Sequence, residues 1–222
     1  MDQGLRPCTH LFLLGDIFDL WIGDHDFFYE KFRPFIDLIS HLKERGVEVQ
    51  YFEGNHDVHV KKFWEDRYGI PCFTMAEYFD VGPVKVRVEH GDLMNLEDKA
   101  YLRLRAFLRR RSLEKLAYKI PGGIWNEIGV RASQLSRRFS GKVRENKSEQ
   151  LRSIIRAHAH RAFKERAFDV IVTGHMHVRD DYEFTEGDRS VRSFNLGSWF
   201  DKTRVLNLQV QDDKPTYRWV DV

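Results

Sequence analysis

The sequence predicts an α/β fold from three observations. Short apolar or alternating runs, typical of buried strands, occur at residues 11–14, 47–52, 84–88 and 168–172. Residues 30–45 carry apolar side chains at helical spacing and are followed by Gly46, an expected C-terminal cap. Each of the four runs leads into a polar segment that contains glycine together with aspartate, asparagine or histidine. Such an alternation of strands and helices is typical of layered α/β domains.

The remaining elements complete this picture. Residues 190–198 and 203–210 are expected to form further strands. Helical spacing extends from residue 101 to a break at Pro121-Gly122-Gly123, and resumes over residues 125–138 and 146–166. We therefore predict a core formed by residues 1–98 and 167–222, interrupted by a helical lid insertion at residues 99–166.

Composition favours a folded protein in a reducing compartment. The 222 residues are 42% hydrophobic, which is enough for one sizeable domain with an insertion. The two cysteines, Cys8 and Cys72, provide neither a metal-type spacing nor a disulfide framework. No apolar run reaches the roughly 18 residues of a membrane span, and the first seven residues lack the order of a signal peptide. We therefore expect a cytoplasmic location.

Charge is distributed unevenly along the chain. Residues 99–166 contain 19 Lys and Arg against 5 Asp and Glu, a formal charge of +14, whereas the remainder carries −12. This asymmetry favours an anionic partner, such as a phosphate group, a nucleic acid or an anionic lipid surface. A solvated helical face is the alternative interpretation.

Polar side chains gather where the four predicted strands end. Because ligand groups in α/β folds collect at the carboxyl ends of strands, we expect these side chains to form one site. A mixture of Asp, Asn and His without Cys suits Mn, Fe or Zn rather than a structural zinc site. Two such ions sharing a carboxylate can hydrolyse a phosphoester. The candidate residues are Asp16, Asn55, His56, Asp57, His90, His175 and His177.

The order of these motifs resembles that of the calcineurin-like metallophosphoesterases. Four of the five family motifs are present: Gly15-Asp16 with Asp19, Gly54-Asn55-His56-Asp57, His90-Gly91 and Gly174-His175-Met176-His177. The resemblance implies a four-layer α/β/β/α sandwich with two metal ions. It also implies that Asp16 bridges both ions, that Asn55, His90 and His175 complete one of them, and that His177 binds the other. His56 would donate a proton to the leaving group, and Asp57 would orient His56.

A narrower resemblance links the chain to the UDP-2,3-diacylglucosamine hydrolases of lipid A synthesis. It rests on the segment from Gly15 to Asp24, and on Asp98, Tyr101 and Arg105 after His90. It implies hydrolysis of the substrate diphosphate to UMP and 2,3-diacylglucosamine 1-phosphate by Mn²⁺-activated water, at the inner face of a bacterial inner membrane. The anionic membrane surface, but no nucleic acid, would be a partner, and Arg109–Arg111 are candidates for phosphate contacts. The implied substrate-binding residues are Asn55, His56, Asp98, Ser140, Arg144, Lys147 and His175.

Two positions and one missing motif depart from the family pattern. Arg144 stands where these hydrolases have asparagine, and His56 stands where they often have arginine. The Asp-x-His motif has no counterpart among the 14 residues before Gly15, so the first strand of the sandwich is expected to be absent. We therefore expect one metal to be held well, by Asp16, Asn55, His90 and His175, and the second to be held weakly or not at all.

Alternative functions follow from the same features. The chain could hydrolyse another nucleotide or phospholipid diester, or it could be an inactive truncated form. The charge of residues 99–166 would also suit a nuclease, although the apolar face and sparse aromatic side chains of this segment argue against one. A non-catalytic binding protein is the last alternative, because one metal motif is missing.

Overall fold

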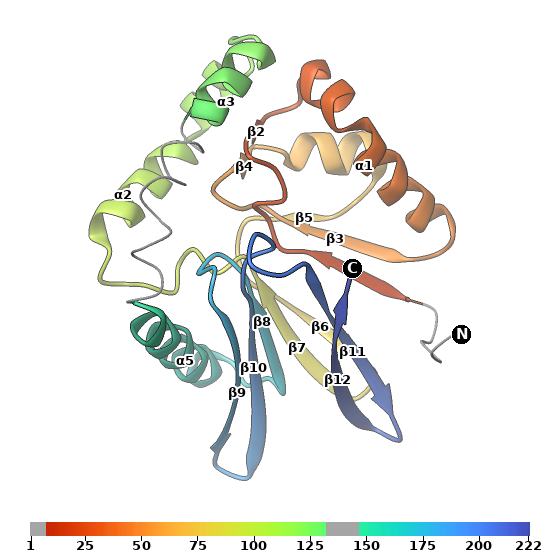
Figure 1. Cartoon of the computed structure of the whole chain (residues 1–222), viewed down its shortest axis with the longest axis vertical. Coiled ribbons are helices and arrows are strands. Elements are labelled where there is room, and N and C mark those ends of the chain that lie inside the picture. Colours follow the sequence, from red (N-terminus) through yellow and green to blue (C-terminus); the bar gives the residue numbers. More distant parts are fainter. Residues whose placement is uncertain (1–7, 132–146) are drawn as a thin grey trace. The chain divides into compact units, whose positions relative to one another are not determined.

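The computed structural model describes residues 8–131 and 147–222 (Figure 1). Contacts between Cα atoms divide the chain into two compact units. The first unit comprises Met1–Thr74 and Arg105–Ser133, and the second comprises Met75–Leu104 and Gln134–Val222. The helix α2 (Lys99–Leu108) contains one of the boundaries between them.

The first unit is built on a parallel sheet. Its strands are β1 (His10–Leu13), β3 (Glu48–Phe52) and β5 (Cys72–Phe73), in the order β1-β3-β5, with Leu13 opposite Tyr51. A separate two-stranded parallel pair joins β2 (Trp21–Ile22) to β4 (Asp57–Val58). The helices of this unit include α1 (Asp26–Glu44), η1 (Phe63–Arg67) and α3 (Arg111–Ala117).

Aromatic side chains form the centre of the first unit. Trp21, Phe28, Phe63 and Trp64 have no exposed surface, and the Trp21 ring lies 4.6 Å from the Phe63 ring. Burying such large side chains is a major source of folding free energy. Trp125, from the helical residues 122–131, also packs against this core. The core therefore holds β2, α1 and η1 together and fixes the loops that leave β1 and β3.

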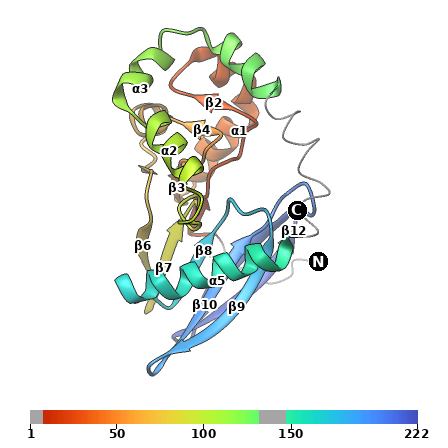
Figure 2. The same ribbon diagram turned by 90° about the vertical axis from the view of Figure 1, so that its left-hand side faces the viewer.

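The second unit has three layers (Figure 2). Its sheet has the order β6-β7-β8-β10-β9, with β7 and β8 parallel, and the helix α5 (Ser148–Glu165) packs on it. Val191 of β10 contributes to the core beneath α5, whereas the Phe194 ring lies 4.9 Å from Tyr217 of the β11–β12 hairpin. The strands are β6 (Glu77–Val81), β7 (Val84–Glu89), β8 (Val170–Thr173), β9 (Arg179–Glu186), β10 (Arg189–Leu196), β11 (Arg204–Gln211) and β12 (Lys214–Asp221).

These elements confirm the predicted α/β class. Every predicted strand is present, with ends shifted by no more than about two residues, which is the usual uncertainty of such boundaries. The helical spacing predicted from residue 101 to the break at Pro121 corresponds to two helices, because α2 ends at Leu108 and α3 starts at Arg111. The helix predicted over 125–138 extends past the described residues, of which 122–131 are helical. The boundaries of the 99–166 insertion stay a prediction.

One further finding concerns membranes. Within residues 8–131 and 147–222, no helix is both long enough and apolar enough to cross a bilayer.

Candidate metal centre

In the first unit, Asp16 and Asn55 lie beyond two neighbouring parallel strands. Asp16 comes three residues after the end of β1, and Asn55 comes three residues after the end of β3. The backbone N–H of His56 donates to Asp16 Oδ1 at 2.9 Å, so the two loops are joined at the candidate carboxylate itself. The predicted convergence of these motifs at the carboxyl ends of strands is confirmed for this pair.

The side-chain oxygen of Asn55 suits a cation. Asn55 Oδ1 is buried and accepts no hydrogen bond from the described residues. Buried polar atoms nearly always have a partner, and one without a partner in the protein calls for another explanation, such as an ion. An amide oxygen is a ligand for hard and borderline divalent cations. Asn55 therefore fits the metal-binding role predicted for it.

Asp57 connects the loop that follows β1 to the loop that follows β3. It has no exposed surface, and its carboxylate accepts hydrogen bonds from the hydroxyl of Tyr51 at 2.6 Å and from the backbone N–H groups of Gly54 and Ile17. These bonds reach the loop after β1 and the loop after β3 together. They assign Asp57 to fixing the backbone around Asp16 and Asn55, while its predicted orientation of His56 stays a prediction.

His56 is oriented by a backbone carbonyl. Its Nδ1 lies 2.9 Å from the carbonyl oxygen of Asp19, which can only accept a hydrogen bond. Nδ1 therefore carries a proton, and in the neutral ring Nε2 is the basic nitrogen. A protonated Nε2 could then serve as the donor that the leaving-group role requires.

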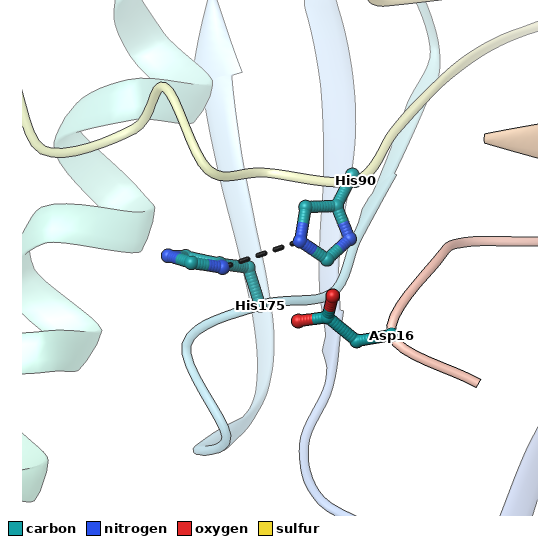
Figure 3. A group of neighbouring side chains, drawn as sticks. All are labelled: Asp16, His90 and His175. Carbon is teal, nitrogen blue, oxygen red and sulfur yellow. Dashed lines mark hydrogen bonds between the residues drawn. The ribbon is translucent and has the colours of Figure 1, made fainter. Parts of the chain in front are cut away.

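In the second unit, His90 and His175 form a contact at the ends of β7 and β8. The carbonyl of His90 accepts a hydrogen bond from Gly174 N at 2.9 Å, and His175 Nδ1 lies 3.2 Å from His90 Nε2 (Figure 3). Two nitrogen ligands, each about 2.0–2.1 Å from one ion at a tetrahedral angle, would lie roughly 3.3–3.4 Å apart. The separation of the two rings thus already matches that of two ligands on one metal.

Three candidate ligands share an uncommon backbone conformation. The φ angles of Asp16, His175 and His177 are +54°, +63° and +56°. This left-handed region is disfavoured for residues with a Cβ atom and is enriched at functional sites. The turn after β8 thus places His175 and His177 at a cost in backbone energy, which is consistent with a demand on where the imidazoles lie.

A polar network surrounds Glu89, the residue that precedes His90. His158 of α5 donates from Nε2 to Glu89, because Arg161, which can only donate, lies 2.8 Å from His158 Nδ1. Arg87 donates to the other Glu89 oxygen at 3.2 Å. Burial by itself would raise the pKa of Glu89, but the hydrogen bond from His158 and the charge of Arg87 lower it below the ordinary value. Glu89 is therefore held ionised one residue before His90.

The first unit also contains a glutamate–arginine pair next to a candidate ligand, and the sequence analysis did not predict it. Glu53 is 3% exposed, lies two residues before Asn55, and pairs with Arg109 at 2.6 Å. Arg109 is a predicted candidate for phosphate contact, but its guanidinium donates to Glu53 and Gly54 of this loop. The available signal was that a glutamate directly precedes both the Gly54-Asn55 and the His90-Gly91 motifs.

The predicted substrate-binding residues are only partly described. Asp98 is exposed, and its Oδ1 accepts from Tyr101 N at 2.9 Å, so it caps the start of α2. Lys147 is exposed at the start of α5. Ser140 and Arg144 lie outside the described residues. Substrate binding by all four stays a prediction.

Replacing Tyr51 with phenylalanine is expected to reduce the loss of stability at alkaline pH. Burial, reinforced by Asp57, raises the pKa of Tyr51 well above 10. A raised folded-state pKa gives stability that is complete below about pH 10 and falls as pH rises further, by up to roughly 1.4 kcal/mol per pH unit. Urea unfolding of both proteins from pH 8 to 11.5 measures this slope. Parallel slopes above pH 10 would contradict the prediction, even if Tyr51→Phe lowers stability at pH 8.

Curated proteins named UDP-2,3-diacylglucosamine hydrolase are similar to this chain over most of its length. The relative from Aliivibrio fischeri (strain MJ11) is 25% identical over 203 residues, which are 88% of this chain and 79% of the relative. The relative from Vibrio atlanticus (strain LGP32) is 27% identical over 199 residues, 88% of this chain and 78% of the relative. These similarities confirm the predicted resemblance and support a hydrolase. No protein-family model matches the chain.

Comparison with solved structures gives low scores. A predicted phosphoesterase from Streptococcus pneumoniae TIGR4 aligns with a TM-score of 0.37 at 13% identity, covering 81% of this chain and 64% of that protein. An archaeal phosphodiesterase aligns with a TM-score of 0.38 at 13% identity, covering 82% and 76%. Such scores carry no weight for function.

Proposed function

We propose that this chain is a metal-dependent phosphoesterase that cleaves the diphosphate of UDP-2,3-diacylglucosamine. The contact between His90 and His175, with ring nitrogens 3.2 Å apart at the ends of two neighbouring parallel strands, is the observation on which the metal dependence rests. The substrate class rests on the similarity to curated hydrolases over 88% of the chain. The products would be UMP and 2,3-diacylglucosamine 1-phosphate.

The proposed metal ligands are those predicted from the sequence. Asp16, Asn55, His90, His175 and His177 would hold Mn²⁺, with one ion bound well and a second bound weakly. When bound, such an ion would polarise a phosphoryl oxygen and lower the pKa of a water ligand. The buried, unpartnered oxygen of Asn55 and the spacing of His90 and His175 support these assignments.

His56 would act on the leaving group. The hydrogen bond from Nδ1 to the Asp19 carbonyl fixes the ring in either protonation state, which leaves Nε2 to hold the transferable proton. Asp57 would keep the loop that carries His56 in register with Asp16, through its bonds to Tyr51 and to the backbone on both sides.

The helical insertion would meet the lipid part of the substrate. Leu104, Phe107 and Leu116 are between 47% and 52% exposed, and they lie among the basic residues of α2 and α3. Exposed apolar side chains within a basic segment suit acyl chains and an anionic membrane surface. We therefore propose that the protein acts at the inner face of a bacterial inner membrane, with Asp98, Ser140, Arg144 and Lys147 contacting the substrate.

The test is turnover of UDP-2,3-diacylglucosamine, followed by release of UMP, in the presence of Mn²⁺ and after its removal with EDTA. We expect activity that disappears with EDTA and returns with Mn²⁺. A simple phosphodiester, bis-p-nitrophenyl phosphate, is assayed in parallel. Cleavage of this compound without cleavage of the UDP substrate would favour a phosphoesterase for another nucleotide or phospholipid diester. Activity that appears only in a chain extended upstream would identify these 222 residues as an inactive form.

A further inference from the structure

We propose that Arg109 is a positioning residue that couples α3 to the loop carrying Asn55 and His56. The proposal rests on the metal-binding function proposed above. It assigns to an arginine of the basic segment a role in metal binding, rather than in contact with substrate or membrane.

The contacts of Arg109 converge on one short stretch of backbone. Arg109 Nη1 donates to Glu53 Oε2 at 2.6 Å, and Nη2 donates to the carbonyl oxygens of Gly54 at 3.1 Å and Glu53 at 3.3 Å. The planar, multidentate guanidinium can make these bonds at once, which a lysine ammonium could not do with the same geometry. Arg109 thus holds both the side chain before Asn55 and the peptide groups that lead into it.

Both oxygens of the Glu53 carboxylate accept hydrogen bonds. Glu53 Oε1 accepts from the backbone N–H groups of Val60 at 2.8 Å and Lys61 at 3.2 Å. The side chains of Glu53 and Arg109 are 3% and 14% exposed. A buried ion pair persists only when the remaining polar atoms are also satisfied, and loss of one partner leaves an uncompensated charge. Glu53 therefore joins the start and the end of the 53–61 loop, and Arg109 supplies its countercharge.

Arg109 lies in the short connection between α2 and α3. The helix α2 ends at Leu108, whose carbonyl accepts from His59 Nε2 at 2.8 Å, and α3 starts at Arg111. The hydroxyl of Tyr118 donates to the His59 carbonyl at 3.4 Å. His59, three residues after His56, is itself in the left-handed region with φ +60°. The residues at and near the break between α2 and α3 are thus hydrogen-bonded to the 53–61 loop at several points.

Energetic coupling follows from this connection. If Arg109 restricts the 53–61 loop to the geometry that a metal requires, its loss must weaken metal binding. Reciprocity requires that metal binding in turn stabilises the segment that Arg109 anchors. We therefore expect Mn²⁺ to slow amide hydrogen exchange in α3, although no proposed metal ligand lies in that helix.

The experiment measures Mn²⁺ affinity by calorimetry and Mn²⁺-dependent hydrogen exchange in residues 111–117, using the full chain. Arg109→Ala is expected to weaken Mn²⁺ binding by about 10–100-fold, the usual effect of removing a group that orients ligands. The protection of α3 by Mn²⁺ should be lost. Arg109→Lys keeps the positive charge but loses the planar set of N–H donors. Its Mn²⁺ affinity should therefore lie between those of Arg109→Ala and the unaltered chain. Arg131→Ala, which removes an exposed arginine of the same unit that pairs with Glu127, is the matched control and should bind Mn²⁺ as the unaltered chain does.

A purely structural role for Arg109 predicts a different pattern. It would lower thermal stability while leaving the Mn²⁺ affinity and the protection of α3 unchanged, and this result would overturn the inference. If Arg109→Ala does not fold, Glu53→Gln/Arg109→Ala leaves no unpaired buried charge and still lacks the bonds to the loop carbonyls, so the same measurements apply to it. Failure of the unaltered chain to bind Mn²⁺ would instead overturn the proposed function, and the inference with it.

Discussion

Replacing His90 with alanine is expected to abolish tight Mn²⁺ binding by this chain. His90 is 5% exposed, and its Nε2 lies 3.2 Å from His175 Nδ1, so both imidazoles are proposed to bind the same ion. The loss should exceed the roughly 10–100-fold that removing an outer, orienting group costs, because a ligand itself is lost. Calorimetric titration with Mn²⁺ measures the change, and phosphoesterase activity should fall with it.

Thermal unfolding provides an independent measure of the same effect. A ligand present at 100 times its Kd stabilises the folded state by about 2.7 kcal/mol. Mn²⁺ should therefore raise the Tm of the unaltered chain and leave that of His90→Ala nearly unchanged. Adding His175→Ala to His90→Ala should cost little more, because ligands of one ion act as a unit. Independent, additive losses would show that the two histidines do not share a metal.

His160→Ala is the matched control. His160 lies on α5 of the same unit, and its ring nitrogens contact Tyr182 and Glu186 rather than any candidate ligand. Its removal deletes one imidazole from the chain without touching the proposed site. Mn²⁺ affinity equal to that of the unaltered chain is expected for His160→Ala, whereas an equal loss in both variants would point to non-specific binding by surface histidines.

The candidate ligands could be predicted because their signals are local. Asp16, Asn55, His90 and His175 each follow a strand within three residues, and the strand itself is visible as an apolar run. Neighbouring parallel strands then bring such residues together without further information. The same reasoning found β1, β3, β7, β8, β10 and β11, but not β6, β9 or β12.

The supporting contacts could not be predicted because they join distant segments. Arg109 and Glu53 are 56 residues apart, and His158 and Glu89 are 69 apart. Nothing in a run of arginines identifies the one whose side chain is only 14% exposed. The break between α2 and α3 was missed for the same reason, because Leu108 ends its helix against His59 and no glycine or proline marks the place. Tertiary contacts decided both features against the local pattern.

Replacing Gly54 with alanine is expected to have the second large effect, through Asp16. A Cβ atom on Gly54 would lie 2.2 Å from Asp16 Oδ1 and 2.6 Å from Asp16 N. The Asp16 backbone has little room to move, because the neighbouring Gly15 also lies close to Gly54. A Cβ atom added to Gly15 would lie 2.4 Å from Gly54 N. The two loops therefore cross at a glycine–glycine contact that leaves no room for a methyl group.

We expect Gly54→Ala to lower the free energy of unfolding by about 1–3 kcal/mol, as overpacking does, and to weaken Mn²⁺ binding by displacing the Asp16 carboxylate. Gly123→Ala is the control for the substitution itself, since its Cβ would meet Phe27 at an ordinary 3.8 Å. Gly46→Ala, with φ +86° and nothing within 4 Å, isolates the cost of backbone strain alone, about 1 kcal/mol or more, without an effect on the metal. If Gly54→Ala matches Gly123→Ala in both Tm and Mn²⁺ affinity, the loop crossing does not set the position of Asp16.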